Sequence, residues 1–307
     1  MKKRIKSLNI KKLFPKKLAN QLLKSESLIK FNGLVLNKFE KKIFLKKIIH
    51  DLDNYKFVKA GSHRINDWES GWGENLKLIK KKNIVKNFIP KYYLKNNVIR
   101  IRNDLVLTKN NSKPEIKILE KILLTSLRYV HNYKAHSKIM EFGAGTGYNL
   151  LSLAREKWIY SMEPFEWSKS GLSCCNYAGK LSKKIKRAHF FDFYKSSFKK
   201  KIDNKIILTV AALEQTGKKF SLFLKNCMNK TDNCVFVNLE PIQELMPNNT
   251  LGKLSKRYAK KRKYLSGFYN FLKKKEKEGK IKILLEAKSQ WGSKYLNGPA
   301  IFIWEKI

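Results

Sequence analysis

The chain has 307 residues, of which 43% are hydrophobic and 12% aromatic, and its formal net charge at pH 7 is +43. This content is enough for a packed core, which excludes a disordered chain, and the length allows one large domain or two ordinary ones. Only nine of the 67 basic residues are arginine. Because dedicated readers of phosphate or bases are usually enriched in arginine, the charge indicates either compositional bias or binding of a polyanion.

The cysteines and the apolar runs bear on the compartment. Cys174 and Cys175 are adjacent and no CxxC pair occurs, so we expect reduced thiols in a cytoplasmic protein and no metal site. The basic start, Met1 to Lys17, has no apolar stretch behind it, so we expect no signal peptide. The longest apolar run, 206–213, is too short for a transmembrane helix, although a basic surface could contact an anionic membrane peripherally.

Residues 1–114 are predicted to form a small mixed α/β accessory domain that covers the substrate. Two hairpins are expected there, around Asn32-Gly33 and around Asn103-Asp104. Between them, apolar residues from 39 to 49 recur at roughly helical spacing.

Residues 115–307 alternate between helix and strand patterns and are predicted to form a second domain. A helix is expected over Glu115–Tyr133, and the strands that follow are separated by helical stretches, which is typical of a mostly parallel α/β sheet. A long helical segment is expected over Thr250–Glu278. The expected strands are Lys138–Phe142, Trp158–Met162, Ala188–Phe191, Lys205–Val210, Asn233–Leu239, Ile281–Ala287 and Ala300–Lys306. No helix separates the last two, so they must be antiparallel.

A glycine-rich loop follows the first of these strands. Gly143-Ala144-Gly145-Thr146-Gly147 stands between the strand and a helix that begins near Tyr148, where glycines permit tight turns and close approach of a ligand. A dinucleotide-binding loop has the spacing GxGxxG, whereas this loop is GxGxG and follows Glu141. A carboxylate at that position disfavours a pyrophosphate and favours a ligand that carries an ammonium group and a sulfonium.

Two further acids are expected at strand ends. Glu163 comes twenty residues after Gly143, at the end of the next predicted strand, where a carboxylate can take both ribose hydroxyls. Asp192 ends the strand after that, where it could bind an adenine amino group while Phe193 packs on the ring.

With this loop and these acids, residues 115–307 resemble a class I S-adenosylmethionine (SAM)-dependent methyltransferase. The resemblance implies SAM as the cofactor and a Rossmann-like, mostly parallel seven-stranded sheet with an antiparallel last strand. It assigns the loop from Gly143 to Gly147 to the methionine end of SAM, Glu163 to the ribose and Asp192 to the adenine. A nucleotide-sugar or NAD-binding Rossmann domain is the alternative.

Three stretches of this lysine-rich chain, 139–154, 206–217 and 231–252, contain no lysine or arginine. Each lies at or next to the C-terminal end of a predicted strand, where open α/β sheets bind ligands. Positive charge there would repel a sulfonium cation. Burial of the strands also excludes lysine, but it does not explain the acids in these stretches. Those acids include Glu141, Glu214, Glu240 and Glu244.

The segment after the fourth strand is expected to face the methyl acceptor. It lacks the Asn/Asp-Pro-Pro-aromatic motif of methylases that act on base amines, and no Pro-Cys pair offers a nucleophile. Hydroxyl, carboxyl or amine acceptors remain, and the enzyme must position and deprotonate them. Glu214 is the first candidate for the base, beside Gln215 as a substrate contact. His189 is the second, although a lone histidine in a strand is commonly a structural hydrogen-bonding residue.

Two other segments could bind the substrate. Trp68 and Trp72 stand among glycines and acids, which fits either a carbohydrate platform or a buried pair that closes the accessory domain onto the sheet. Arg257 and Tyr258 belong to a basic segment with interleaved aromatics, 254–275. Such a segment could grip phosphate or could be a solvated face over a packed aromatic stripe.

A narrower resemblance concerns the acceptor. The runs Leu213-Glu214-Gln215, Glu240 to Glu244 and Arg257 to Phe268 resemble methyltransferases associated with bacterial surface polysaccharides. This implies a sugar O-methyltransferase of polysaccharide biosynthesis, with Glu240 among the residues that contact a small-molecule or glycan acceptor. One alternative is an RNA methyltransferase, which the charge favours and the lysine excess does not. The other is a SAM-fold module that binds without catalysis.

Overall fold

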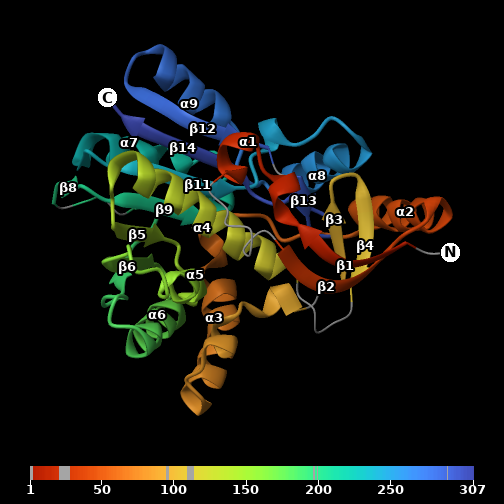
Figure 1. Cartoon of the computed structure of the whole chain (residues 1–307), viewed down its shortest axis with the longest axis horizontal. Coiled ribbons are helices and arrows are strands. Elements are labelled where there is room, and N and C mark those ends of the chain that lie inside the picture. Colours follow the sequence, from red (N-terminus) through yellow and green to blue (C-terminus); the bar gives the residue numbers. More distant parts are fainter. Residues whose placement is uncertain are drawn as a thin grey trace.

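The computed structural model describes residues 3–20, 28–94, 97–108, 114–195, 198, 200–288 and 290–307. Its strands form two main sheets that lie beside each other, with helices packed around the larger one (Figure 1). The helices are α1 Lys16–Ala19, α2 Lys38–Asn54, α3 Ile65–Lys81, α4 Pro114–Lys134, α5 Tyr148–Leu153, α6 Lys169–Leu181, α7 Phe220–Lys230, α8 Thr250–Lys261 and α9 Phe268–Lys277. The strands are β1 Arg4–Asn9, β2 Leu28–Val35, β3 Val98–Ile101, β4 Asp104–Thr108, β5 Lys138–Phe142, β6 Ser161–Glu166, β7 His189–Phe190, β8 Ile202–Asp203, β9 Ile206–Val210, β10 Thr231–Asp232, β11 Val235–Glu240, β12 Ile281–Ala287, β13 Trp291–Gly292 and β14 Ala300–Lys306. Within these described ranges, no helix is both long and apolar enough to cross a bilayer.

The larger sheet has seven strands in the order β12-β14-β11-β9-β5-β6-β7. The strands from β11 to β7 pair in parallel, and β14 is antiparallel to both of its neighbours. The predicted fold class, a mostly parallel Rossmann-like sheet with an antiparallel last strand, is confirmed. β9 and β11 are buried along their whole length, as expected for apolar strands covered on both faces.

Alternate side chains of the central strands pack into two different cores. In β5, Ile139 joins a core with residues of α4, α5 and α6, whereas Phe142 joins a core with residues of α7 and α9. Because successive side chains of a strand point to opposite faces, these helices cover the two faces of the sheet. Ligands can therefore reach it only at the strand ends.

The strand β6 starts later and runs further than the predicted strand over 158–162. Its register pairs Lys138 with Ser161 and Phe142 with Phe165. Trp158 precedes the strand, and its ring stacks on His131 with the centroids 4.5 Å apart. The apolar residues just before β6 thus make core contacts without joining the sheet, which moves the strand's carboxyl end to Glu166.

The smaller sheet has the order β1-β2-β4-β3-β13 and is antiparallel. Its last strand, β13, comes from the loop between β12 and β14, where Trp291 pairs with Ile101. The sheet therefore joins residues from both sides of the expected boundary at 114. The division into 1–114 and 115–307 stays a prediction.

Of the two expected hairpins, the one around Asn103-Asp104 is confirmed by the pairing of β3 with β4. The one around Asn32-Gly33 is wrong, since β2 runs straight through this pair and is bonded to β1 on one side and β4 on the other. A Cβ at Gly33 would meet Val106 at 2.6 Å. The absence of a side chain at Gly33 therefore leaves room for the Val106 side chain of the neighbouring strand β4, and Gly33 does not form a turn.

The helices α2, α6 and α8 begin at polar caps, Asn37, Ser168 and Asn249. Asn37 and Glu40 form a reciprocal capping box at the start of α2, where a helix was expected. The expected helical segment 250–278 is interrupted between α8 and α9, and Gly267 with φ of 83° precedes α9. Because of this break, Arg262 is the C-terminal cap residue of α8 and does not continue into α9.

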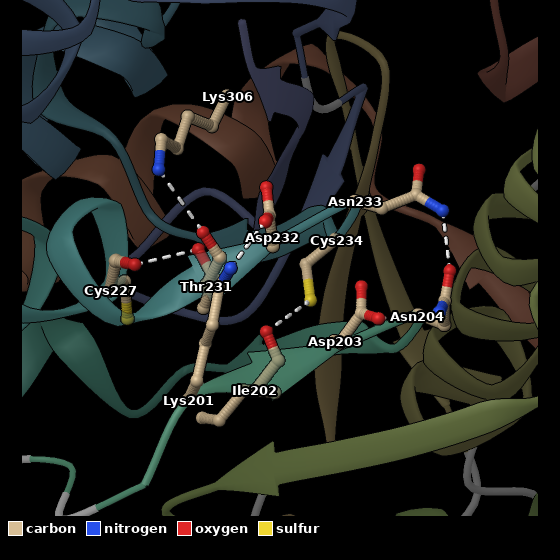
Figure 2. Close-up of polar contacts among 10 residues, drawn as sticks. All are labelled: Lys201, Ile202, Asp203, Asn204, Cys227, Thr231, Asp232, Asn233, Cys234 and Lys306. Carbon is tan, nitrogen blue, oxygen red and sulfur yellow. Dashed lines mark hydrogen bonds and ion pairs between the residues drawn. The ribbon is translucent and has the colours of Figure 1, made fainter.

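The amino ends of the central strands carry a separate polar cluster (Figure 2). The short strands β8 and β10 pair in parallel just before β9 and β11 begin. Lys201 forms an ion pair with Asp232 at 2.6 Å, and the Lys306 ammonium donates to the Thr231 carbonyl at 3.3 Å. The Cys234 thiol donates to the Ile202 carbonyl at 3.6 Å. These contacts tie the strand starts together at the edge opposite to the glycine loop.

Candidate functional site

The glycine loop joins β5 to α5 where the strand order of the large sheet reverses. β5 lies between β6 and β9, and chains leaving β5 and β9 pass to opposite faces, which opens a crevice at their carboxyl ends. Gly143, Gly145 and Gly147 have φ of 75°, 57° and 79°, values that residues with a Cβ rarely adopt. A Cβ at Gly143 would also meet the Ala212 side chain at 2.5 Å. The sequence of the loop is thus dictated by its backbone and by close packing.

Hydrogen bonds fix the loop to its neighbours. The amides of Gly143 and Ala144 donate to the Phe165 carbonyl at 2.8 and 3.1 Å. The Thr146 hydroxyl donates to the Phe88 carbonyl at 2.6 Å, which links the loop to the N-terminal half. Ala144 and Thr146 also line a cavity beside the loop.

Glu141, the acid before the loop, is completely buried. One of its oxygens accepts a hydrogen bond from the Asn149 amide at 2.7 Å, whereas its Oε2 has no partner among the described residues. Burial raises the pKa of this carboxyl to about 8, and the nearby Glu166 adds to the effect. A buried acceptor without a partner is costly, and this one lies directly before the glycine loop.

The acid at the end of β6 is Glu166, and the expected position of Glu163 at a strand end is wrong. Glu163 lies in mid-strand opposite Met140, and it forms an ion pair with Lys205 at 2.6 Å. Glu166 is buried at the carboxyl end and accepts hydrogen bonds from the Gly145 amide at 2.8 Å and from Ser168 at 3.0 Å. Ser168 caps α6, so an acid two residues before a helix cap is the pattern that could have identified Glu166.

The third acid, Asp192, lies two residues beyond β7. Its Oδ1 accepts a hydrogen bond from the Tyr194 amide at 2.8 Å. Phe193 lines a cavity together with Glu166, Trp167 and Tyr194. Trp167 and Tyr194 were not expected in the site, because each is a single aromatic residue in an aromatic-rich chain.

Two cavities of about 60 Å³ each lie at the glycine loop. Both have Gly143 and Ala211 in their walls, and both are lined by the pair Trp68 and Trp72. One extends along the loop toward Asn149, and the other extends toward the end of β6. The two cavities therefore lie on either side of Gly143, and the tryptophan pair forms part of the wall of each.

Trp68 and Trp72 lie one turn apart on α3, and their rings stack with centroids 5.4 Å apart. Trp72 is buried, and its ring stands 3.0 Å from where a Cβ of Gly145 would be. α3 packs against α6, so the pair closes the N-terminal half onto the glycine loop, as one of the two hypotheses expected. The carbohydrate-platform hypothesis stays a prediction.

A larger cavity of about 390 Å³, here called the acceptor cavity, adjoins these two and shares Trp68 and Ala211 with them. The expected substrate residues Gln215 and Tyr258 line it, as does Glu214. Its further polar lining consists of Arg64, Glu115, Arg262, Ser293 and Asn297, and its aromatic lining includes Tyr92, Tyr93, Tyr264 and Trp291. Arg262 and Tyr264 belong to the expected basic segment 254–275. The others come from four separate segments of the chain, which is why sequence patterns did not identify them.

Glu214 is the second residue of a short 3-10 helix, Leu213–Thr216, which follows the end of β9 at Val210. Its Oε1 accepts a hydrogen bond from the side-chain amide of Gln215 at 2.7 Å. Burial raises the pKa of Glu214 to about 8, and the charge of Glu240 contributes. An acid whose pKa lies near neutral pH is suited to exchange a proton with a substrate.

Glu240 does not line the acceptor cavity, which contradicts its expected role as a substrate contact. It is completely buried, and its carboxylate accepts hydrogen bonds from the Ala212, Leu213 and Glu214 amides, each at 3.1 Å. Ala211 before them has φ of 49°, a left-handed conformation that costs a residue with a Cβ about 1 kcal/mol. Glu240 therefore holds the strained turn that presents Glu214.

Two expected site residues lie elsewhere. His189 is exposed on β7 at the edge of the sheet, where its ring stacks on Phe165, so its place as second candidate for the base is wrong. Arg257 points away from the acceptor cavity and pairs with Asp53 of α2. In both cases the residue lies on an element of the site, but its side chain faces outward.

No protein-family model matches the chain, and no curated protein matches it. Among solved structures, the chain is similar to a SAM-dependent methyltransferase from Clostridium acetobutylicum, at 11% identity over 58% of this chain and 87% of that one, with a TM-score of 0.41. It is similar to a plantazolicin methyltransferase solved with S-adenosylhomocysteine (SAH), at 14% identity over 85% and 98% and a TM-score of 0.43. It is also similar to an O-methyltransferase from neocarzinostatin biosynthesis, at 12% identity over 62% and 56% and a TM-score of 0.43. The ligand of this chain has to follow from its own residues.

Proposed function

We propose that the chain is a SAM-dependent methyltransferase that acts on a hydroxyl of a sugar or glycan precursor. The observation that carries this proposal is the loop Gly143–Gly147 at the reversal of strand order, with the buried carboxylates Glu141 and Glu166 on either side. Methyltransferases among the similar structures, including one solved with SAH, are consistent with it.

The residues at the crevice fit SAM. The glycine loop and Glu141, whose Oε2 has no partner among the described residues, would hold the methionine end with its ammonium group. Glu166, in place of Glu163, would accept the ribose hydroxyls, and Phe193 with Trp167 would flank the adenine. No lysine or arginine lines either of the two small cavities that the structure describes there, which suits a sulfonium cation.

SAM supplies an electrophilic methyl group on its sulfonium when bound. Glu214 would take the proton of the acceptor hydroxyl, because it lines the acceptor cavity next to Ala211, which also lines the cavities of the loop. Glu240 and Gln215 would act as positioning residues for Glu214. The Trp68–Trp72 pair would cover the crevice and exclude water, which strengthens electrostatic interactions within it.

A sugar is favoured by the wall of the acceptor cavity. Flat rings such as Trp68, Tyr92 and Tyr258 can pack on the C–H faces of a sugar, and polar groups such as Gln215 and Asn297 can bind hydroxyls. Its volume is within the range of small-molecule sites, about 300 to 1,000 Å³. The four cysteines are free and buried, which fits a reducing, cytoplasmic compartment. A sugar acceptor in that compartment would suit a role in polysaccharide precursor synthesis.

The test is incubation with SAM labelled in its methyl group and separate pools of nucleotide sugars, glycolipids and RNA. The proposal expects label in a sugar-containing pool, and loss of that label in Glu214→Gln. Label in RNA alone would contradict the sugar acceptor and leave the cofactor in place. Binding of SAM without label in any pool would support a module that binds without catalysis.

A further inference from the structure

We propose that the acceptor carries an oxyanion, either a phosphate or a carboxylate, and that Arg262 binds this group in the acceptor cavity. The assignment of the ligand as the methyl acceptor rests on the proposed function. The anion site itself rests on the residues described next.

The basic residues in the wall of the acceptor cavity are arginines, whereas most basic residues of the chain are lysines. Arg64 and Arg262 line the acceptor cavity, and no lysine is among the described residues that line it. A neighbouring cavity of about 310 Å³ shares Trp291 and Asn297 with it and is lined by Arg100 and Arg102, again with no lysine among its described lining.

Arginine makes up only nine of the 67 basic residues of the chain. Four of those nine therefore line two adjoining cavities. Arginine binds carboxylate and phosphate through two parallel hydrogen bonds, which the ammonium group of lysine cannot do. Compositional bias toward lysine does not explain these four positions.

Arg262 is the guanidinium of the cavity with the fewest polar contacts. Its Nη1 donates to the Tyr258 hydroxyl at a long 3.5 Å, and its Nε is buried without a hydrogen-bond partner among the described residues. The guanidinium lies near the rings of Tyr258 and Tyr264, with centroids 5.8 and 5.0 Å away. These rings orient the group and leave its charge unneutralised.

The other arginines nearby are already paired. Arg257 lies on the same helix and forms an ion pair with Asp53. Arg64 forms one with Asp67 at 3.0 Å and also donates to the Gln215 side chain at 3.0 Å. No described carboxylate forms an ion pair with Arg262 within 4.0 Å. Arg262 is therefore the cation of the acceptor cavity that a ligand can neutralise.

The two acids of the cavity supply only part of that neutralisation. Burial raises the pKa of Glu115 to about 7 and that of Glu214 to about 8, so at neutral pH Glu115 carries about half a negative charge and Glu214 carries less. The cavity then holds two guanidinium groups and at most partial negative charge. A ligand with an oxyanion at Arg262 and a hydroxyl at Glu214 would complement both ends of it.

Binding of simple probes tests the anion site without turnover. Calorimetry would compare glucose 1-phosphate, glucuronate and glucose as the phosphate, carboxylate and neutral arms, with and without SAH, in about 150 mM NaCl to screen the basic surface. We expect saturable binding of at least one oxyanion, about tenfold tighter than that of glucose. The arm that binds more tightly identifies the oxyanion.

Arg262→Gln is the test variant and Arg257→Gln is its matched control on the same helix. We expect Arg262→Gln to weaken oxyanion binding about tenfold and Arg257→Gln to change it less than twofold. Equal effects of the two variants, equal affinity for glucose, or no saturable binding of either oxyanion would overturn the proposal. An unchanged melting temperature and SAH affinity in Arg262→Gln would show that the fold is kept. Compared with Arg262→Gln, Arg262→Lys should restore only part of the oxyanion affinity. If the wild-type protein binds an oxyanion but does not bind SAH, the proposed function is refuted and the anion site is retained.

Discussion

The acidic groups at the two ends of the strands in the seven-stranded sheet differ in their burial. At the amino edge, Lys201 pairs with Asp232 and Lys306 donates to the Thr231 carbonyl, close to solvent (Figure 2). At the carboxyl edge, acids such as Glu141 and Glu240 are completely buried, and Glu141 keeps an oxygen without a partner among the described residues. This buried oxygen lies beside the glycine loop, where the proposed cofactor would bind.

Left-handed backbone occurs at both edges. At the amino edge, Asn204 and Asn233 have φ of 54° and 42°, a conformation that asparagine tolerates better than other residues with a Cβ, and Ala135, which precedes β5, has φ of 55°. At the carboxyl edge Ala211 adopts φ of 49° without that advantage. Three hydrogen bonds to Glu240 follow directly after it. The left-handed turn at Ala211 is the one that presents Glu214 to the acceptor cavity.

The largest effect is expected from Glu214→Gln. If Glu214 removes the acceptor proton, the rate of methyl transfer should fall about 10² to 10⁴-fold, while SAH affinity stays the same. The matched change at the other edge, Asp232→Asn, should leave the rate unaltered. A rate within a few fold of the wild type in Glu214→Gln would exclude it as the base.

The next effect concerns the glycine loop. Gly145→Ala should weaken SAH binding at least about tenfold, because the position has φ of 57° and an added Cβ would lie 3.0 Å from the Trp72 ring. Gly279→Ala is the control, since Gly279 has φ of 69° but nothing within 4 Å of its Cβ position. It should lower the melting temperature slightly and leave SAH affinity intact. If both variants bind SAH as the wild type does, the loop is not the cofactor site.

The pH dependence of stability should have opposite signs at the two edges. Burial raises the pKa of Glu141 to about 8, so the folded state binds its proton more tightly than the unfolded chain does. Its contribution is present at low pH and is lost as pH rises from about 4.5 toward 8, by up to about 1.4 kcal/mol per pH unit. Urea unfolding at pH 5 to 8 should show a smaller decline in Glu141→Gln. An identical decline in the variant and the wild type would mean that Glu141 does not titrate in this range.

The smallest effect is expected at the amino edge, where the pH dependence of stability at Asp232 has the opposite sign to that at Glu141. Its hydrogen bond and ion pair with Lys201 lower its pKa, so its contribution is lost as pH falls through that value and is complete at neutral pH. Lys201→Ala should therefore leave the melting temperature unchanged at pH 5 to 8 within the precision of calorimetry, since the pair is exposed. A clear decrease would show that the amino edge carries more stability than its exposure implies.

The sequence was sufficient where a feature depends on neighbours along the chain. The loop Gly143–Gly147 follows from glycine spacing, and the succession of strands and helices along the chain follows from alternating patterns; both were predicted. β13 is a two-residue strand whose pairing with β3 depends on the whole fold, and no local pattern marks it. Glu163 was chosen because the apolar run before it ended early, whereas the register with β5 places Glu166 at the strand end.

The acceptor cavity shows the same limit more strongly. Glu214 was predicted because it follows a strand directly. Arg64, Glu115 and Arg262 line the same cavity from distant segments, and only tertiary packing brings them together. Arg257 and Arg262 lie five residues apart in one basic segment, yet one faces Asp53 and the other faces the cavity. The difference arises from helical phase and from the break after α8.

The most direct test of the carboxyl edge as the cofactor site is calorimetric titration of the wild-type protein with SAM and SAH. We predict saturable binding at one site per chain, weakened at least about tenfold by Glu166→Gln and unaffected by Asp232→Asn at the opposite edge. Absence of SAM and SAH binding, or equal weakening by the two substitutions, would contradict it.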